Sequence, residues 1–224
     1  MAVSPQIVRD AVTEIVKCEL QQIAELLVVH DDRIERAKIL DNVREDLHNE
    51  TKTFLFLTEQ REHEHIEFVN YLLDFIPEFI LDCMPEFQCE SSKKHDFSKD
   101  NLFFFVAASY FSAQVQSKEM KSLIDEELKR HYTLEAHHPE FELYNESECT
   151  DIDIMEMAID RLSRNAQFGN SHIDLDVIKK YLPNFPKGNN DRKQELFWNY
   201  VNKYKDFVQE KFHLLFPESL MWTV

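Results

Sequence analysis

The sequence predicts an all-α fold, and three observations support this class. Apolar residues recur at helical spacing over long stretches of the 224-residue chain. The chain contains only 2 glycines and 7 prolines, fewer turn residues than a fold built from β-hairpins would use. Hydrophobic residues make up 43% and aromatic residues 12%, which is enough apolar surface for a sizeable core. We therefore expect helices joined by short polar loops and packed as one domain.

The first half of the chain predicts three long helices. Ser4 suits an N-cap and Pro5 suits the first helical turn, and apolar residues follow at helical spacing. A mostly polar helix is expected over residues 33–49, and a third helix over about 51–75, where Pro77 stops it. Residues 77–94 are expected to form a short helix and then a loop.

The middle of the chain holds the strongly apolar run Phe97–Phe111. Such a run can be read as a strand, but its length and the alanines Ala107 and Ala108 favour a buried helix. An amphipathic helix is expected over residues 117–131, and an acid-rich loop is expected over residues 137–149.

The last part of the chain begins with a capping signal. Thr150 is followed three residues later by Asp153, a spacing that resembles a capping box, and the helix it opens ends before Gly169, which suits its C-terminal cap. A short helix over residues 174–181 follows. Prolines and a glycine then interrupt the chain before a last helix over residues 192–212.

The net charge of −17 restricts the partners of this chain. A protein this acidic repels a nucleic-acid backbone, and the sequence has no basic stripe, so we expect no broad nucleic-acid binding. A small phosphorylated substrate is compatible with this charge if a metal ion and nearby lysines offset it. No apolar run is long enough to span a bilayer, and no signal peptide is visible, so we expect no membrane partner. The four cysteines show no CxxC spacing, and reduced thiols in a cytoplasmic protein are expected.

His65 is the first candidate metal ligand. It precedes Val69 by four residues and Leu72 by seven, which places it on or beside the apolar face of its expected helix. A single histidine on such a face is usually a packed core residue with one hydrogen bond. His65 is therefore a candidate metal ligand only in combination with the other candidate residues.

The pair His95–Asp96 is the second candidate. An adjacent His–Asp pair is common by chance, but Lys99 follows three residues later and an apolar helix comes directly after it. Imidazole and carboxylate groups are the usual ligands of zinc, manganese and iron, and helices can supply them from facing sides.

Three more histidines lie between this pair and the last candidate, at positions 131, 137 and 138. The alternative for His137 and His138 is a solvated turn shaped by Pro139. Asp160 and Glu156 lie four residues apart on an otherwise apolar helix, where a buried carboxylate needs a partner. A metal ion is one such partner, and Arg161 or Arg164 is the alternative.

The order of these residues resembles the HD superfamily of metal-dependent phosphohydrolases. His65 precedes His95 by 30 residues, and Asp160 follows Asp96 by 64 residues, as in the family pattern. The runs His95-Asp96-Phe97-Ser98-Lys99 and His137-His138-Pro139-Glu140, with residues 150–160, resemble a small and little-characterised HD-like branch found in bacteria and phages. The resemblance covers roughly residues 60–185.

The resemblance implies an HD-like helical bundle. Its metal-binding core would span residues 51–188, with a helical extension over 1–50 and an aromatic-rich helix over 189–224 that completes the same domain. The implied ligands are His65, His95, Asp96 and Asp160, with His131, His137 and His138 as candidates for a second ion. The spacing leaves open which of these three binds. One or two divalent ions are implied, of manganese, iron, zinc, cobalt or magnesium.

The implied chemistry is hydrolysis of a small phosphoester or nucleotide by metal-activated water. Lys99 would hold the substrate phosphate, and Glu156 or Glu140 would orient His137 or His138. Two alternatives stay open: an HD-fold di-iron oxygenase, and a non-catalytic helical metal-binding module. The C-terminal aromatic residues are expected to form core, and the alternative is a homo-oligomer interface.

Overall fold

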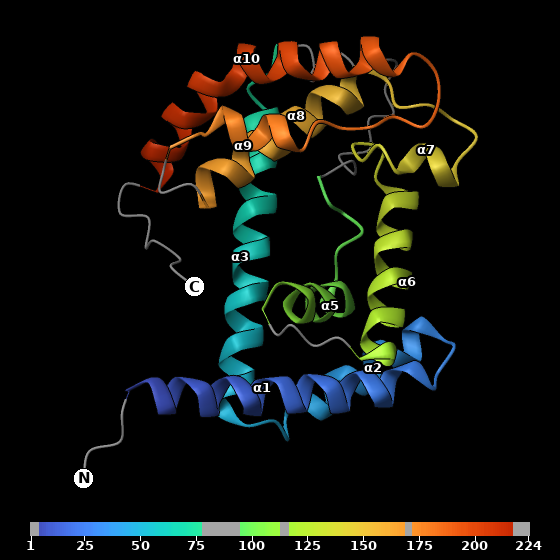
Figure 1. Cartoon of the computed structure of the whole chain (residues 1–224), viewed down its shortest axis with the longest axis vertical. Coiled ribbons are helices and arrows are strands. Elements are labelled where there is room, and N and C mark those ends of the chain that lie inside the picture. Colours follow the sequence, from blue (N-terminus) through green and yellow to red (C-terminus); the bar gives the residue numbers. More distant parts are fainter. Residues whose placement is uncertain (1–4, 78–94, 113–116, 169–171, 217–224) are drawn as a thin grey trace. The chain divides into compact units, whose positions relative to one another are not determined.

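The computed structural model describes residues 5–77, 95–112, 117–168 and 172–216. Every regular element in these ranges is a helix, which confirms the predicted all-α class (Figure 1). The helices are α1 (Pro5–Val28), α2 (Arg33–Arg44), α3 (Asn49–Leu73), α5 (Asn101–Ser112), α6 (Lys118–Leu134), α7 (Phe141–Tyr144), α8 (Asp151–Phe168), α9 (Leu175–Lys180) and α10 (Asn190–Leu215).

Two helix boundaries differ most from the predicted ones, and a side-chain contact accounts for each. Helix α2 ends at Arg44 rather than near residue 49, and the backbone N–H of His48 instead donates to the Glu19 carboxylate on α1. Helix α5 begins only at Asn101, because the Asp100 carboxylate caps it by accepting from the backbone of the following residues. The acid-rich loop contains the short helix α7. The short helix expected within residues 77–94 lies almost wholly outside the described residues, as does the predicted cap at Gly169.

The chain divides into two compact units. Unit 1 comprises residues 1–63 and 98–131, and unit 2 comprises residues 64–97 and 132–224. The division falls within α3, after His63, and within α6, after His131. The predicted terminal extensions, with boundaries at residues 50 and 188, stay a prediction.

Unit 1 has its own hydrophobic core. Its helices bury one cluster of aliphatic and aromatic side chains: Val16, Leu20, Ile23, Ala24, Leu27, Leu40, Leu55, Leu102, Phe105, Val106, Met120, Leu123 and Ile124. Beside it, Arg33 at the start of α2 donates from Nε and a terminal nitrogen to the two oxygens of buried Glu127, each at 3.0 Å. This paired geometry compensates the buried carboxylate.

Unit 2 is organised around α8 and α10, which lie along each other (Figure 1). Its core is a second cluster that includes residues from α3, α8 and α10, among them Phe68, Leu72, Met155, Ile159, Leu162, Phe197, Val201 and Phe212. The aromatic residues Phe197 and Phe212 are buried, as predicted for the C-terminal helix. Because α3 and α8 both bury an apolar face in this cluster, side chains near that face are held in defined positions.

Two observations concern the membrane and cysteine predictions. Among the described residues, no helix combines the length and apolar character that crossing a membrane requires. Cys18 and Cys149 carry free thiols, as predicted, whereas Cys83 and Cys89 lie outside the described residues.

The capping box at the start of α8 is confirmed and predicts a stability effect. Thr150 N–H donates to Asp153 Oδ2 at 2.7 Å, and Asp153 N–H donates to Thr150 Oγ1 at 3.3 Å. Thr150→Ala should lower the free energy of unfolding by about 1 kcal/mol, because it leaves one N–H of the first turn without its partner. Chemical denaturation measures the loss. Ser147→Ala, an exposed change in the preceding loop, should have no effect, and an equal loss in both variants would contradict the capping role.

Candidate metal centre

Histidine and acidic side chains from remote parts of the chain meet inside unit 2. His65 comes from α3 and Asp160 from α8. His95 and Asp96 lie in a turn that precedes α5, and His137 lies in the turn between α6 and α7. All five residues are buried.

The first contact joins α3 to α8. The Nε2 atom of His65 lies 2.7 Å from Oδ1 of Asp160, and its Nδ1 atom lies 2.9 Å from Oε1 of Gln167. Gln167 follows Asp160 by seven residues, so both side chains project from the same face of α8. The imidazole is therefore held from both ends, with Nε2 turned toward the aspartate.

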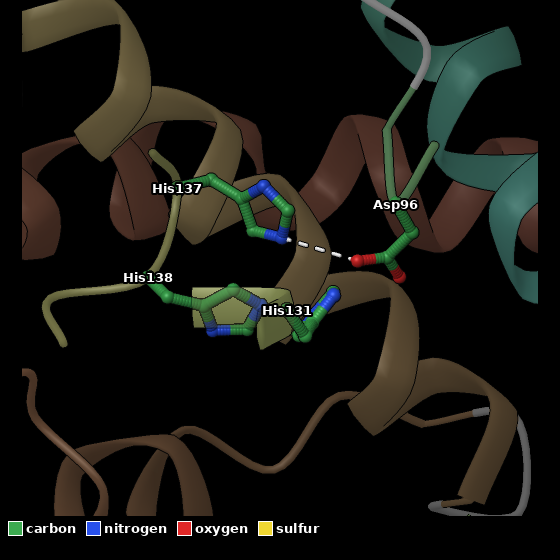
Figure 2. A group of neighbouring side chains, drawn as sticks. All are labelled: Asp96, His131, His137 and His138. Carbon is green, nitrogen blue, oxygen red and sulfur yellow. Dashed lines mark ion pairs between the residues drawn. The ribbon is translucent and has the colours of Figure 1, made fainter. Parts of the chain in front are cut away.

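Glu156 orients two further imidazoles. Its Oε1 atom lies 2.9 Å from Nδ1 of His95 and 3.2 Å from Nδ1 of His137. Both rings therefore turn their Nε2 atoms away from Glu156 and toward Asp96. The Nε2 atom of His95 lies 3.2 Å from Oδ2 of Asp96, and that of His137 lies 3.4 Å from Oδ1 (Figure 2).

His95 connects the two aspartates. Its Nε2 atom also lies 3.6 Å from Oδ1 of Asp160, so one nitrogen is close to both carboxylates. Although this nitrogen is buried, it has no hydrogen-bond partner among the described residues. The Nε2 atoms of His65, His95 and His137 thus face the oxygens of Asp96 and Asp160.

The backbone at Asp96 has an unusual conformation. Its φ angle is 56°, in the left-handed region that residues other than glycine rarely adopt, although aspartate tolerates it better than most. The preceding N–H, of His95, donates to Oδ1 of Asn70 on α3 at 2.9 Å. Backbone strain of this kind concentrates at functional sites, where the surrounding structure maintains it.

Burial and charge shift the pKa values of the imidazoles in different directions. Burial lowers the pKa of His95, but the Asp96 carboxylate and neighbouring acceptors outweigh it and raise the pKa well above its ordinary value. Burial lowers the pKa of His137 too, yet the charge of Glu156 raises it to about 9. For His65, burial dominates and lowers the pKa to about 4.

The carboxylates stay ionised despite their burial. Burial raises the pKa of Asp160, but its hydrogen bond with His65 and the nearby His95 imidazole hold it well below its ordinary value. Burial raises the pKa of Glu156, and the charge of His137 outweighs this and lowers it to about 2. Without a metal ion, protons on His95 and His137 therefore compensate the buried negative charge.

Nitrogen and oxygen atoms of these types form two groupings that could hold a metal ion within unit 2. One combines His65, His95 and Asp160, and the other combines His95, His137 and Glu156. We favour a metal position beside the Nε2 atoms, because three imidazoles and two aspartates face each other there. Nδ1 atoms held by a carboxylate or an amide are typical of histidines that bind metal through Nε2. The residues therefore fit a divalent cation of the zinc, manganese or iron type.

Four further predicted residues have contacts of their own. The half-buried ring of His138 packs beside that of His137, with centroids 4.3 Å apart (Figure 2). Glu140 is half-buried at the N-cap of α7. His131 belongs to unit 1, where its Nδ1 atom lies 2.8 Å from Oγ of Ser98. Lys99 also belongs to unit 1, and its Nζ atom lies 3.3 Å from Oε2 of buried Glu62. Metal binding by His131 and His138, and the predicted roles of Lys99 and Glu140, stay predictions.

Two residues of the centre were not found by sequence reasoning. Gln167 and Asn70 contact His65 and the backbone of His95, but amide side chains carry no metal-ligand signature. The heptad spacing between Asp160 and Gln167 was the one available signal, because it places both on one helix face.

Comparisons with known proteins place the chain in a family. Residues 55–213 match a family described as "Family of unknown function (DUF5662)", and this match covers well over half of the chain, which therefore belongs to that family. No curated protein and no solved structure matches the chain significantly. The family carries no assigned activity, so function has to be argued from the centre.

The pKa shifts predict how stability depends on pH without metal. His95 and His137 have raised pKa values in the folded state, so their stabilisation is complete below about pH 6.5, the unfolded value, and is lost as the pH rises through their folded values. The thermal midpoint in chelator should therefore fall between pH 6.5 and 9. Added Mn²⁺ should reduce this fall, because the cation replaces the lost protons.

Circular dichroism melts at four pH values, with chelator and with Mn²⁺, measure this effect. His172 is an exposed histidine of unit 2 outside the centre, so His172→Ala serves as the control and should keep the same pH profile. A metal-free midpoint that does not change over this range would contradict the assigned charge states.

Proposed function

We propose that this member of the DUF5662 family is a metal-dependent hydrolase of the HD type that cleaves a small phosphoester or nucleotide. The proposal rests on one observation above all: the Nε2 atoms of three buried imidazoles face the oxygens of two buried aspartates, while Gln167 and Glu156 hold the opposite nitrogens. The order of these residues along the chain also resembles the HD superfamily.

In this proposal His65, His95, Asp96 and Asp160 hold one divalent ion. Four protein ligands leave positions for water and substrate in a cation that accepts five or six ligands. A bound ion of this kind lowers the pKa of water and polarises a phosphoryl oxygen. Glu156 and Gln167 keep the imidazole rings oriented, so that the ligand atoms need not reorganise when the ion binds.

His137 is the further histidine of the centre. Its Nε2 atom lies near Oδ1 of Asp96, that of His95 lies near Oδ2, and Glu156 accepts from both rings. We assign it as an additional ligand, either to the same ion or to a second one. Its raised pKa means that metal binding there releases a proton near neutral pH.

The second part of the proposal is that the substrate carries a phosphate group, which Lys99 would bind. Lys99 follows Asp96 by three residues, and its side chain pairs with Glu62 in the structure. A substrate phosphate would compete with Glu62 for the ammonium group, and Lys99 would then offset charge that develops during cleavage. We propose a small phosphorylated substrate in a cytoplasmic protein.

Two alternatives lead to different measurements. A di-iron oxygenase on the same fold would contain two irons per chain. We rank it second because the centre contains three imidazoles that could bind iron. A non-catalytic metal-binding module would bind metal but hydrolyse no phosphoester. Elemental analysis of protein purified without added metal, followed by a screen of nucleotides and other phosphoesters with the metal found, separates the three.

The ligand assignment predicts the effect of removing Asp96. Asp96→Ala should abolish stoichiometric metal binding and leave most of the helical content intact. Asp96→Asn is the second variant, because asparagine tolerates the left-handed backbone and removes only the charge. Elemental analysis and far-ultraviolet circular dichroism measure the two properties. Asp151→Ala removes an exposed carboxylate at the start of α8 and should retain metal, and stoichiometric metal in either Asp96 variant refutes the assignment.

The proposed role of Lys99 predicts a separate effect. Lys99→Ala should lower kcat/KM for a phosphoester substrate by about 10-fold to 1,000-fold, since a cation that stabilises developing charge is worth this much. The metal content should not change, because Lys99 is not a ligand. Steady-state kinetics with the best substrate of the screen measures the loss. Lys129→Ala, in the same unit, is the control, and kinetics equal to wild type for Lys99→Ala would remove Lys99 from the site.

A further inference from the structure

A second buried cluster of charges lies in unit 2, outside the metal centre. The side chains of Glu142 and Lys193 are 0% and 5% exposed, and Nζ of Lys193 lies 2.6 Å from Oε1 of Glu142. The same Nζ atom lies 2.8 Å from Oε2 of Glu148 and 2.9 Å from the carbonyl oxygen of Lys187. The three N–H groups of the ammonium thus have three acceptors.

Glu142 joins three segments of unit 2. Besides Lys193 on α10, its carboxylate accepts from the backbone N–H of Cys149, just before α8, and from that of Lys187, in the loop before α10, both at 2.8 Å. Gly188, in the same loop, has a backbone conformation that favours glycine. A Cβ atom there would lie 2.1 Å from Oε2 of Glu148, and the φ angle of +66° disfavours a side chain as well.

The cluster is linked to His137 by a short, hydrogen-bonded stretch of chain. His138 N–H donates to the carbonyl oxygen of Glu135 at 3.2 Å, and Phe141 N–H donates to that of His138 at 3.0 Å. Glu142 follows directly, five residues after His137. Because backbone hydrogen bonds close these turns, a shift of Glu142 would move the backbone that carries His137.

The cluster is linked to Glu156 from the other side. Cys149, whose N–H bonds Glu142, is followed at once by the capping box of α8, and Glu156 lies on that helix. Glu142 therefore ties together the two segments whose side chains meet in the His137–Glu156 contact of 3.2 Å.

Stability alone does not account for such a pair. Removing two charges from water costs about as much as their attraction returns, and apolar residues of similar volume often replace a buried ion pair without loss of stability. A buried ion pair does, however, define geometry, because its hydrogen bonds have direction and an alternative packing would leave a charge uncompensated.

We propose that Glu142 and Lys193 are positioning residues of the metal centre. They hold the turn that carries His137 at the distance from α8 at which Glu156 accepts from its Nδ1 atom and its Nε2 atom faces Asp96. This inference rests on the proposed function, in which His137 is a metal ligand.

The test uses Co²⁺, whose visible absorption bands report its ligands, with three single variants of the full chain. Lys193→Met breaks the cluster, and Glu142→Gln is a milder change that keeps the shape if the first variant does not fold. Arg192→Met is the matched control, because Arg192 is adjacent on α10 and pairs with Asp151 of α8 at 2.9 Å, but on the exposed surface. We expect both cluster variants to bind Co²⁺ about 10-fold to 100-fold more weakly with altered bands, and the control to match wild type.

A double-mutant cycle with His137→Ala separates positioning from general loosening. If the cluster acts through His137, adding Lys193→Met or Glu142→Gln to His137→Ala should cause little further loss of Co²⁺ affinity. The full loss in the double variant, or wild-type affinity and bands in the folded single variants, would overturn the proposal.

Hydrogen exchange distinguishes failure of this inference from failure of the proposed function. Wild-type protein that does not bind Co²⁺ would refute the metal centre itself. In metal-free protein the cluster variants should still exchange amides of residues 135–149 at least about 10-fold faster than Arg192→Met, because the turn has lost its tether. Equal exchange rates would refute the positioning role whether or not metal binds.

Discussion

A carboxylate that leaves water must meet positive charge or hydrogen-bond donors, and in unit 2 the buried Asp96 and Asp160 and the largely buried Glu156 meet imidazoles. Without a metal ion, protons on His95 and His137 supply the positive charge, which is why the pKa values of these two histidines are raised. A divalent cation can take over this role. The candidate metal centre and the core of unit 2 share their helices, because α3 and α8 contribute residues to both.

The imidazoles divide the centre into two sides. On the Nδ1 side, the side chains of Gln167 and Glu156 contact the rings and determine their orientation. On the Nε2 side, nitrogen and carboxylate oxygen atoms face each other at distances of 2.7–3.6 Å. A purely structural network needs only charge compensation. The consistent orientation of three rings is the feature that a metal ligand set requires, and it carries the proposed function.

The two charge clusters of unit 2 differ in how completely their polar groups are hydrogen-bonded. In the Lys193 cluster every N–H of the ammonium has an acceptor, so the group is complete as it stands. At the metal centre the buried Nε2 atom of His95 has no hydrogen-bond partner among the described residues. A fully hydrogen-bonded cluster suits a structural support, whereas a buried imidazole nitrogen that lies near two carboxylates without a completed hydrogen bond suits a metal ligand. The proposed division of roles between the two clusters follows from this contrast.

Local patterns in the sequence determined much of this protein. The period of apolar residues predicts the helices, the spacing from Thr150 to Asp153 predicts the start of α8, and the position of His65 relative to Val69 predicts its burial. These features depend on residues within one or two helical turns of each other, so sequence spacing represents them directly. The end of α2 was missed because a carboxylate on α1 competes with the helix for the backbone of His48.

Only the tertiary structure decided which remote residues meet. Spacing could not predict that the His137 ring lies against Asp96 and Glu156, or that His131 lies beside Ser98 within unit 1. The fold also assigned Glu156 to two rings at once, and brought Gln167 to His65 and Lys193 to Glu142. The reason is physical: such distances are set by how the helices pack through their apolar faces, and residues far apart in sequence come close only when that packing is complete.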